Sequence, residues 1–448
     1  MSTEDRAAED RALAYVKRAQ ELAGDIPGLP AEAAGWRPAT AAVVGAGTMG
    51  GGIAMSLANA GVPVTLIDRA GADVERGLSR IKANYATSVK RGSIEAAEAD
   101  ARLARITGAA DLAAVAGADL VIEAVFEEMT VKQEVFRALD SHAAPGALLG
   151  TNTSALDIDA IASATSRPAD VIGTHFFAPA NVMKLLEVVP GAATAPLTLA
   201  RAMALGKALG KVAVRAGNVR GFIGNAMLFD YIRESHFLVE EGAFPADVDR
   251  VLKDFGFAMG LFTMTDMSGL DIGIESKRKQ REASPADRRY SYIGLLPPDM
   301  GRLGQKTGAG WYRYEPGDRT PHRDPEMDAA IVEYSARIGI TRREISDSEI
   351  LNRIMYALVN RAAWLLETGV ALKATDIDAV YVTGYGFPRA KGGPLYWADS
   401  VGLPTVLDGV ERLHAEHGVW WEPAPLLTKL ARSGGTFTGN TATQEETR

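Results

Sequence analysis

The stretch from Thr40 to Arg69 constrains the fold more than any other part of this chain. It reads TAAVVGAGTMGGGIAMSLANAGVPVTLIDR, with three glycines in G-x-G-x-x-G spacing between two apolar runs, the second of which ends at Asp68. This order is typical of a buried strand, a tight glycine turn, a helix and a second parallel strand. The stretch therefore predicts a dinucleotide-binding βαβ unit.

Each glycine of the motif has its own physical task. The first makes the tight turn, the second lets a pyrophosphate approach the backbone, and the third lets helix and strand pack closely. Asp68 lies 18 residues past Gly50 and is placed to accept both hydroxyls of an adenosine ribose and to repel a 2′-phosphate, so we predict NAD and not NADP, although Arg69 lies beside it. The residues expected at the cofactor here are Gly45, Gly47, Thr48, Met49, Gly50 and Asp68.

Composition excludes several classes of function. The chain has 448 residues and a formal net charge of −8, which argues against nucleic acid as the main partner. It has no cysteine, so disulfides, thiol catalysis and cysteine-ligated metals are excluded, and no cluster has metal-ligand spacing.

No apolar segment reaches membrane-spanning length, and the charged start MSTEDRAAEDR is unlike a signal peptide. We therefore expect a cytoplasmic protein with no membrane association.

Apolar runs alternate with helical periodicities over the first half of the chain. This alternation predicts a mostly parallel, doubly wound α/β sheet of Rossmann type. From Gly221 onward the pattern is helical only, with candidate helices at 221–241, 246–255 and 264–279. The expected strands are 41–44, 62–67, 118–125, 148–152, 170–177, 185–189 and 212–215.

The helical half contains an internal repeat. Asn225 and the following LVEEG and DVD are echoed by Asn352 and the following LLETG and DID, and Gly256-Phe257 is echoed by Gly386-Phe387. The offset is 127 residues at the asparagines and grows further along the chain. This predicts two all-α domains from a duplicated unit. The expected divisions are an N-terminal helix and linker at 1–36, an NAD-binding domain at 37–216, helical domains at 217–320 and 321–440, and a flexible tail at 441–448.

The N-terminal helix has one small apolar face. Ala12, Val16, Ala19 and Ala23 recur at helical spacing within residues 4–24. The face predicts a helix that docks on another part of the protein. A merely solvated helix is the equal alternative from this pattern.

Two side chains on consecutive predicted strands suggest proton chemistry. His175 ends an apolar strand and Glu187 lies within the next, so on adjacent strands the carboxylate would bond one imidazole nitrogen and leave the other to take a proton. Ser154, after the strand that carries Asn152, and Asn225, which opens the helical half, complete the candidates. The structural alternatives are a packing role for His175, a cap by Ser154 on the helix after residue 157, and a cap or packing role for Asn225.

The residues resemble those of a known family. From about Arg37 to Pro316 the chain is similar to the L-3-hydroxyacyl-CoA dehydrogenases of fatty-acid β-oxidation, through motifs such as VVGAGTMGGGIA, GTNTSAL, GTHFFAPANVMKLLEVV and GFIGNAMLFDYIRE. With the second helical block it most resembles the dehydrogenase half of the multifunctional β-oxidation enzymes, without their enoyl-CoA hydratase domain. The resemblance implies a reversible, NAD-dependent oxidation of 3-hydroxyacyl-CoA to 3-ketoacyl-CoA.

The resemblance also implies residue roles. His175 would remove the 3-hydroxyl proton, Glu187 would orient and polarise His175, and Ser154 and Asn225 would position substrate. Glu127, Lys132 and Lys306 match cofactor-contacting positions, although the two lysines have surface charge as their alternative role, and Ser154 also borders the cofactor. Two departures are Ala178 and Ala226, where the family has Asn and Arg.

Two other functions compete with this one. The first is a dehydrogenase for a free or modified hydroxy acid, which a requirement for the CoA portion would exclude. The second is a weakly active scaffold for a separate hydratase or thiolase, suggested by the orphaned linker helix and by Ala178 and Ala226. The expected assembly is a monomer or a homodimer.

Overall fold

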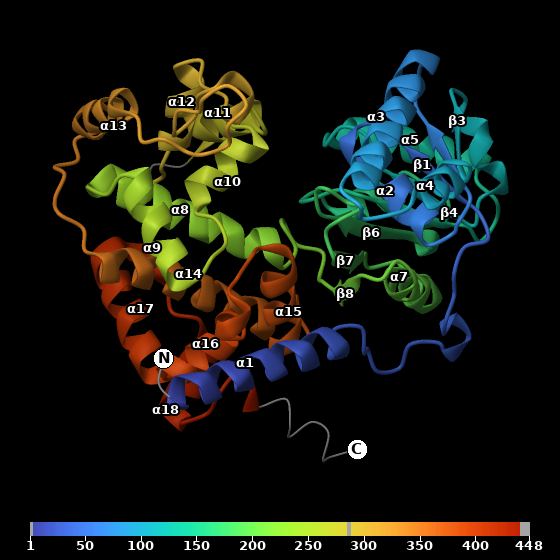
Figure 1. The fold of residues 1–448 in the computed structure, drawn as a ribbon. Coiled ribbons are helices and arrows are strands. Elements are labelled where there is room, and N and C mark those ends of the chain that lie inside the picture. The colour runs from blue at the N-terminus through green and yellow to red at the C-terminus, as the bar shows by residue number, and fades with distance from the viewer. Residues whose placement is uncertain (1–2, 285–287, 440–448) are drawn as a thin grey trace. The chain divides into compact units, whose positions relative to one another are not determined.

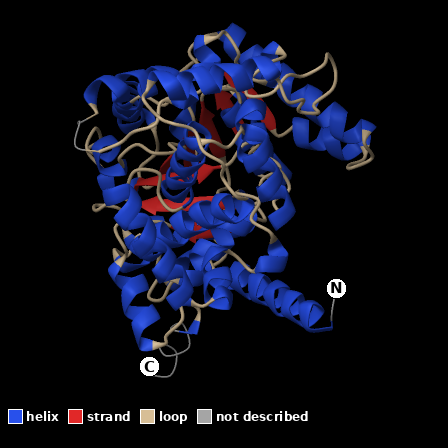
Figure 2. Ribbon diagram, turned by 90° about the vertical axis from the view of Figure 1, so that its left-hand side faces the viewer, coloured by secondary structure: helices blue, strands red, loops and turns tan. Residues whose placement is uncertain are grey.

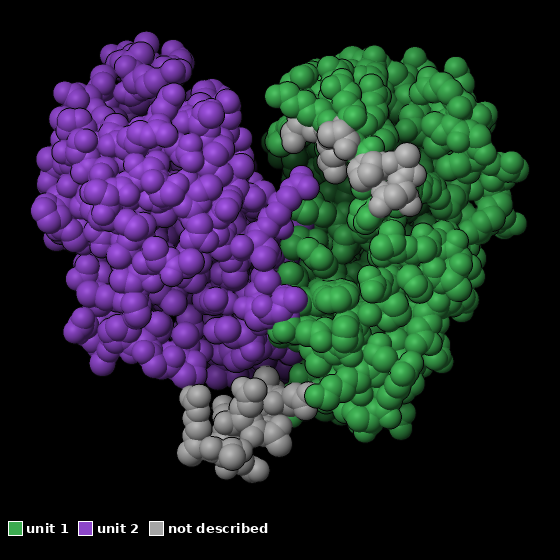
Figure 3. Space-filling model, turned by 180° about the vertical axis from the view of Figure 1, so that it is seen from behind, with its two compact units in different colours: residues 1–13, 226–367, 386–448 green, residues 14–225, 368–385 purple. Residues whose placement is uncertain are grey.

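The computed structural model describes residues 3–284 and 288–439, in two compact units (Figure 3). The sheet unit comprises Ala14–Asn225 and Thr368–Tyr385, and the helical unit comprises Met1–Leu13, Ala226–Glu367 and Gly386–Arg448. The predicted tail at 441–448 lies outside the described residues. The predicted domain boundaries stay predictions, because the compact units do not follow them: Thr368–Tyr385, a segment of the second repeat, belongs to the sheet unit.

The sheet unit is built on eight strands in the order β3-β2-β1-β4-β5-β6-β7-β8 (Figure 1). All neighbours are parallel except β6 and β7, which are antiparallel. This is the predicted doubly wound α/β class. The strands are β1 Ala41–Val44, β2 Val64–Ile67, β3 Ile106–Ala109, β4 Leu120–Glu123, β5 Leu148–Thr151, β6 Val171–Phe176, β7 Leu185–Pro190 and β8 Val212–Arg215.

Helices cover both faces of this sheet, which is why its central strands are buried along their length and mostly apolar (Figure 2). Val43 on one face packs with α2 and α3, whereas Val44 on the other packs with α5. The helices are α2 Thr48–Asn59, α3 Gly71–Lys90, α4 Ala96–Leu103, α5 Met129–His142, α6 Ile158–Ala162 and α7 Pro196–Ala208.

The N-terminal helix α1, Thr3–Leu22, docks as its apolar face predicts. Ala12, Val16, Ala19 and Ala23 are all buried, which excludes the solvated alternative. Within the sheet unit, Tyr15 donates a hydrogen bond to Asp378, with an oxygen–oxygen distance of 2.8 Å. The partner belongs to α15, Ala374–Gly384, which itself packs against β7 and β8.

The remaining regular elements of the described chain are helices and isolated β-bridges. The predicted helix at 264–279 is wrong as a single element, because Gly269 and Gly273 adopt positive φ angles of 102° and 72° and divide it. The helices are α8 Gly224–Glu241, α9 Pro245–Phe255, α10 Leu261–Ser268, α11 Ile274–Ala283, α12 Leu296–Asp299, α13 Pro325–Arg337, α14 Asp347–Glu367, α16 Pro394–Val401, α17 Leu403–His417 and α18 Pro425–Ser433.

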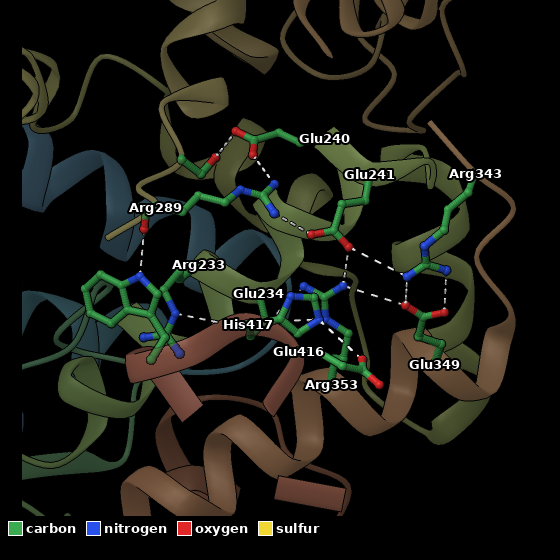
Figure 4. A network of polar contacts seen from close by, with 12 residues as sticks. Arg233, Glu234, Glu240, Glu241, Arg289, Arg343, Glu349, Arg353, Glu416 and His417 are labelled. Atoms are coloured by element: carbon green, nitrogen blue, oxygen red, sulfur yellow. Dashed lines mark hydrogen bonds and ion pairs between the residues drawn. The ribbon is translucent and has the colours of Figure 1, made fainter. Parts of the chain in front are cut away.

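A buried arginine joins the two repeats within the helical unit (Figure 4). Arg353 of α14 is 1% exposed and bonds Glu241 at 2.5 Å and Glu234 at 3.1 Å, both on α8. Its counterpart in the first repeat is the buried Ala226, and the 127-residue offset pairs Glu234 with Arg361 and Glu241 with Thr368. The repeat would place a second arginine–glutamate cluster at these three positions, but the arginine and both glutamates are absent from them. Ala226 therefore leaves no carboxylate without an arginine partner at that place.

Candidate active site

The glycine turn of the sheet unit has the shape that its motif predicts. Gly45 has φ +106°, and a Cβ atom there would lie 2.6 Å from the Ala124 carbonyl oxygen. A Cβ at Gly50 would lie 1.8 Å from the Gly45 carbonyl oxygen, so helix α2 crosses the strand at a distance that only glycine permits. Gly47 is the N-cap of α2, and nothing lies within 4 Å of its Cβ position. The turn therefore offers open backbone at a helix N-terminus, as a pyrophosphate requires.

A cavity of about 910 Å³ opens on this turn. Thr48 and Met49 line it from α2, and Asp68 lines it from the end of β2. The Asp68 carboxylate is fixed there because one oxygen accepts the Ala46 amide at 2.7 Å and the other accepts the Arg69 amide at 2.7 Å. The cavity and its donor set fit a dinucleotide.

Sequence reasoning missed the basic side of this cavity. Arg76 and Arg80 of α3 line it, and Arg80 donates to the Thr48 hydroxyl at 3.3 Å. Their spacing of four residues places both on one face of the helix that follows Asp68. That spacing was the available signal.

Glu127 and Ser154 meet beyond the ends of β4 and β5. One Glu127 oxygen accepts the Ser154 amide at 2.7 Å, the Ser154 hydroxyl at 3.0 Å and the Thr153 hydroxyl at 2.7 Å. Burial opposes ionisation of Glu127, but the Lys132 ammonium and these donors outweigh it and lower the pKa of the carboxyl. Ser154 does not cap the next helix, because the side chain of Asp157 accepts the Asp159 amide there.

Lys132 is not the surface charge that was its alternative role. It is 1% exposed, and its ammonium bonds Glu123 at 2.7 Å and lies 3.4 Å from Glu127. Glu123 also accepts the Val125 amide and the Thr151 hydroxyl, each at 2.7 Å. The sequence signal for this cluster is a glutamate inside the apolar run ADLVIEAV. The cofactor contact of Lys132 stays a prediction.

His175 and Glu187 form a pair across two adjacent strands. They are direct partners in the antiparallel register of β6 and β7, so both side chains leave the same face of the sheet. His175 Nδ1 lies 2.8 Å from Glu187 Oε2, and both residues are buried. Glu187 Oε1 accepts the amides of Ile223 and Gly224 at 3.1 and 3.0 Å. The carboxylate is thereby held, and the imidazole Nε2 is left for another molecule.

Aromatic rings enclose the imidazole of this pair. Phe177 lies 4.3 Å from His175 between ring centroids, and Phe222 lies 5.8 Å away. Phe222 adopts φ +54°, an unusual backbone conformation for a bulky residue. Ala178, where the family has Asn, follows Phe177 at an exposed position.

Asn225 connects to Ser154 within the sheet unit. Its side-chain nitrogen donates to the Ser154 carbonyl oxygen at 3.3 Å. Its side-chain oxygen accepts a hydrogen bond from the hydroxyl of Tyr385, a residue of the second repeat. The amide therefore does not cap its own helix. The structure brings Ser154 together with Asn225 and Glu127, and His175 together with Glu187.

Lys306 lies in the helical unit, where its ammonium pairs with Asp271 and half of its side chain is exposed. Its predicted cofactor contact stays a prediction. Within residues 3–284 and 288–439, no group of three or more His, Asp or Glu side chains is suited to a metal ion. No helix of this described part has the length and apolar character needed to cross a bilayer.

A doubly wound sheet, a glycine turn on a dinucleotide-sized cavity and a histidine–carboxylate pair together define a dinucleotide-dependent oxidoreductase. The chain belongs to the 3-hydroxyacyl-CoA dehydrogenase family. Residues 40–219 match the NAD-binding domain of that family. Residues 221–314 and again 350–443 match its C-terminal domain, which agrees with the internal repeat. NAD is accordingly the cofactor.

Curated relatives extend this result. The chain is 42% identical over 424 residues to the peroxisomal bifunctional enzyme of Homo sapiens, covering 90% of this chain and 58% of that enzyme. It is 32% identical over 440 residues to a peroxisomal fatty acid β-oxidation multifunctional protein of Oryza sativa, covering 97% and 60%. The chain thus spans about three fifths of the length of these relatives. The prediction of a cytoplasmic protein is wrong on this comparison, because these relatives are named peroxisomal.

Solved structures share the fold over most of the chain. A 3-hydroxybutyryl-CoA dehydrogenase from Escherichia coli is similar with a TM-score of 0.76 and 29% identity, covering 89% of this chain and all of that one. The dehydrogenase part of multifunctional enzyme 1 from C. elegans is similar with a TM-score of 0.67 and 26% identity, covering 93% and 96%. Both are dehydrogenases by name, and the first is named for a CoA ester.

Proposed function

We propose that this chain oxidises L-3-hydroxyacyl-CoA to 3-ketoacyl-CoA, reversibly, with His175 as the general base. The buried His175–Glu187 pair, with its 2.8 Å nitrogen–oxygen distance, is the observation that carries the proposal. A general base must present one free acceptor and have its other nitrogen fixed. Glu187 and the two amides behind it meet that requirement.

The chemistry divides between cofactor and protein. When bound, NAD supplies the acceptor for the hydride that leaves C3 of the substrate. His175 Nε2 takes the proton of the 3-hydroxyl, and Glu187 stabilises the imidazolium that forms. In the reverse direction the same imidazolium returns the proton to the alkoxide oxygen.

The remaining polar groups bind and orient. Ser154 and Asn225, joined at 3.3 Å, are assigned to substrate, and Glu127 keeps the Ser154 hydroxyl in place. The Gly45–Gly50 turn holds the pyrophosphate and Asp68 holds the adenosine ribose. Glu127, Lys132, Ser154 and Lys306 are proposed to border the cofactor.

The test is NADH oxidation with acetoacetyl-CoA, a longer 3-ketoacyl-CoA and free acetoacetate. We expect turnover with both CoA esters and none with the free acid. Turnover with free acetoacetate would favour the hydroxy-acid alternative. A folded protein that binds NADH but turns over none of these would favour the scaffold for a separate hydratase or thiolase, which co-purification would then identify.

For assembly we propose that the second repeat covers the first as a partner subunit would. The buried Arg353–Glu241 bond between the repeats supports this within the helical unit. Light scattering should then give a monomer mass near 47.5 kDa. A homodimer mass would contradict this form of the proposal.

A further inference from the structure

Tyr385 is a residue of the second repeat that belongs to the sheet unit. It directly follows α15, the helix that packs on β7 and β8. Its hydroxyl donates to the Asn225 side-chain oxygen at 2.9 Å, across 160 residues of sequence. No step of the mechanism above uses this contact.

The ring of Tyr385 is fixed on several sides. It packs edge-on against Phe177 at 5.6 Å and stacks on Tyr381 at 4.9 Å, between ring centroids. A Cβ atom at Gly224 would lie 2.4 Å from the tyrosine oxygen, so glycine at that position admits the ring. The same Phe177 contacts the imidazole of His175 at 4.3 Å. Tyr385 therefore supports two members of the candidate site.

Two hydrogen bonds together fix the orientation of the Asn225 amide. The Ser154 carbonyl can only accept, so it takes the amide nitrogen, and the Tyr385 hydroxyl donates to the amide oxygen on the other side. Burial, and the charge of Glu187, raise the pKa of Tyr385 well above its usual range. The hydroxyl consequently remains a donor throughout the neutral range. Without it, the amide oxygen loses its donor and the single 3.3 Å bond to the Ser154 carbonyl is left to orient the amide.

The internal repeat offers a comparison for this hydroxyl. The correspondence of Gly256-Phe257 with Gly386-Phe387 pairs Tyr385 with Phe255 of the first repeat. Phe255 lies among Phe257, Phe387 and Trp397 in the helical unit, at ring centroid distances of 5.9 to 6.0 Å. An aromatic ring is thus kept in both repeats, whereas the hydroxyl is present only in the copy that bonds Asn225.

We propose that Tyr385 is a positioning residue of the dehydrogenase reaction, which holds the Asn225 amide with its nitrogen on the side of Ser154, where substrate is assigned. The proposal rests on the proposed function. It means that the second repeat completes the active site and is not only a structural cover.

The test replaces the hydroxyl and keeps the ring, in Tyr385→Phe. We expect kcat with acetoacetyl-CoA to fall about tenfold, which corresponds to the loss of one hydrogen bond, with the KM for NADH unchanged. The matched control is Tyr85→Phe, because Tyr85 also donates a buried hydroxyl to an asparagine oxygen, that of Asn59 at 2.8 Å, away from the cavity lining. Tyr85→Phe should leave kcat unchanged.

A double-mutant cycle separates positioning from a general effect on the fold. In the Asn225→Ala background, Tyr385→Phe should cause no further loss of kcat, because the group through which Tyr385 acts is gone. An equal tenfold loss in both backgrounds, or an unchanged kcat in the single variant, would overturn the proposal.

A measurement without turnover keeps the two proposals distinguishable. The Asn225 NH₂ signals of [¹⁵N]asparagine-labelled protein are assigned by their loss in Asn225→Ala. Tyr385→Phe should shift them and Tyr85→Phe should not, whether or not the wild-type protein is active. If the wild type fails to reduce any CoA ester, the proposed function fails; if the Asn225 signals do not move, the positioning by Tyr385 fails.

Discussion

Two buried acid–base pairs each contain a glutamate of the same sheet, and they differ in what they leave open. In one, the Lys132 ammonium bonds Glu123 at 2.7 Å, and Glu123 is 0% exposed. In the other, His175 bonds Glu187 at 2.8 Å, and Glu187 is likewise 0% exposed. Burial and distance therefore do not separate a structural pair from a catalytic one.

The difference lies in the cationic partner. A lysine ammonium next to a carboxylate stays charged at neutral pH, and Lys132 directs its charge inward at Glu123 and Glu127. An imidazole changes its charge near neutral pH and has a second nitrogen, which Glu187 does not occupy. Only the histidine pair can accept a proton from a third molecule and return it. Four predictions test this comparison, from the largest expected effect to the smallest.

The largest effect is expected for His175→Ala. Turnover should fall by about two to four orders of magnitude, the usual scale for the loss of a general base. NAD affinity should persist, because His175 does not line the dinucleotide cavity. Steady-state kinetics and a titration with NADH measure the two quantities. Near-wild-type turnover would refute the assignment of the base.

Lys132→Met should act on the fold instead. It leaves Glu123 buried without its cation, and removing one partner of a buried pair costs about 3–5 kcal/mol of unfolding free energy. Urea unfolding measures the loss. The double variant Lys132→Met/Glu123→Gln should recover much of it, because no lone charge then remains.

The control for Lys132→Met is an exposed pair. Lys17 lies 4.0 Å from Glu21 on α1, with its side chain 79% exposed. Lys17→Met should leave the unfolding midpoint essentially unchanged, since surface pairs contribute little. If Lys132→Met were equally silent, Lys132 would not be the structural member of the comparison.

Glu187→Gln tests the carboxylate of the catalytic pair. The substitution keeps the shape of the side chain but removes the charge that stabilises the imidazolium, so turnover should fall by about one to two orders of magnitude. The effect on NAD affinity should be smaller. A loss of NADH binding as large as the loss of turnover would instead assign Glu187 to the structure of the cavity.

The sequence predicts those parts of the molecule that local patterns determine. The βαβ unit follows from the spacing of Gly45, Gly47 and Gly50 in front of a regular helix. The pair of His175 and Glu187 follows from two consecutive strands, since a short connection brings such strands together. Both depend on residues near one another in the chain.

The parts that sequence reasoning missed depend on distant contacts. Strand β3 reads ITGA and lies at the sheet edge, where two of its four residues are exposed and a Cβ at Gly108 would lie 2.5 Å from Val74. Its low strand propensity reflects the helix packed on it.

Tyr385 joins the site from 160 residues beyond Asn225, and no local pattern marks that contact.

A second histidine sharpens the comparison with the smallest effect. His236 lies in the helical unit with its ring 6.1 Å from Phe262 and 6.0 Å from Trp311, between centroids. Burial, and then the charge of Lys277, lower the pKa of His236 to about 3. It packs among aromatic rings and stays neutral, whereas His175 is proposed to exchange protons.

The lowered pKa of His236 makes stability depend on pH with a defined sign. The unfolded chain binds a proton at His236 below its ordinary pKa of 6.5, whereas the folded chain does so only near pH 3. The stability that neutral His236 contributes is therefore present above pH 6.5 and lost as the pH falls toward 3, by about 1.4 kcal/mol per pH unit. In His236→Gln this slope should be reduced, as urea unfolding at pH 7, 6 and 5 would measure. An unchanged slope would mean that His236 is protonated in the folded state, and that a buried histidine here needs no carboxylate partner to carry charge.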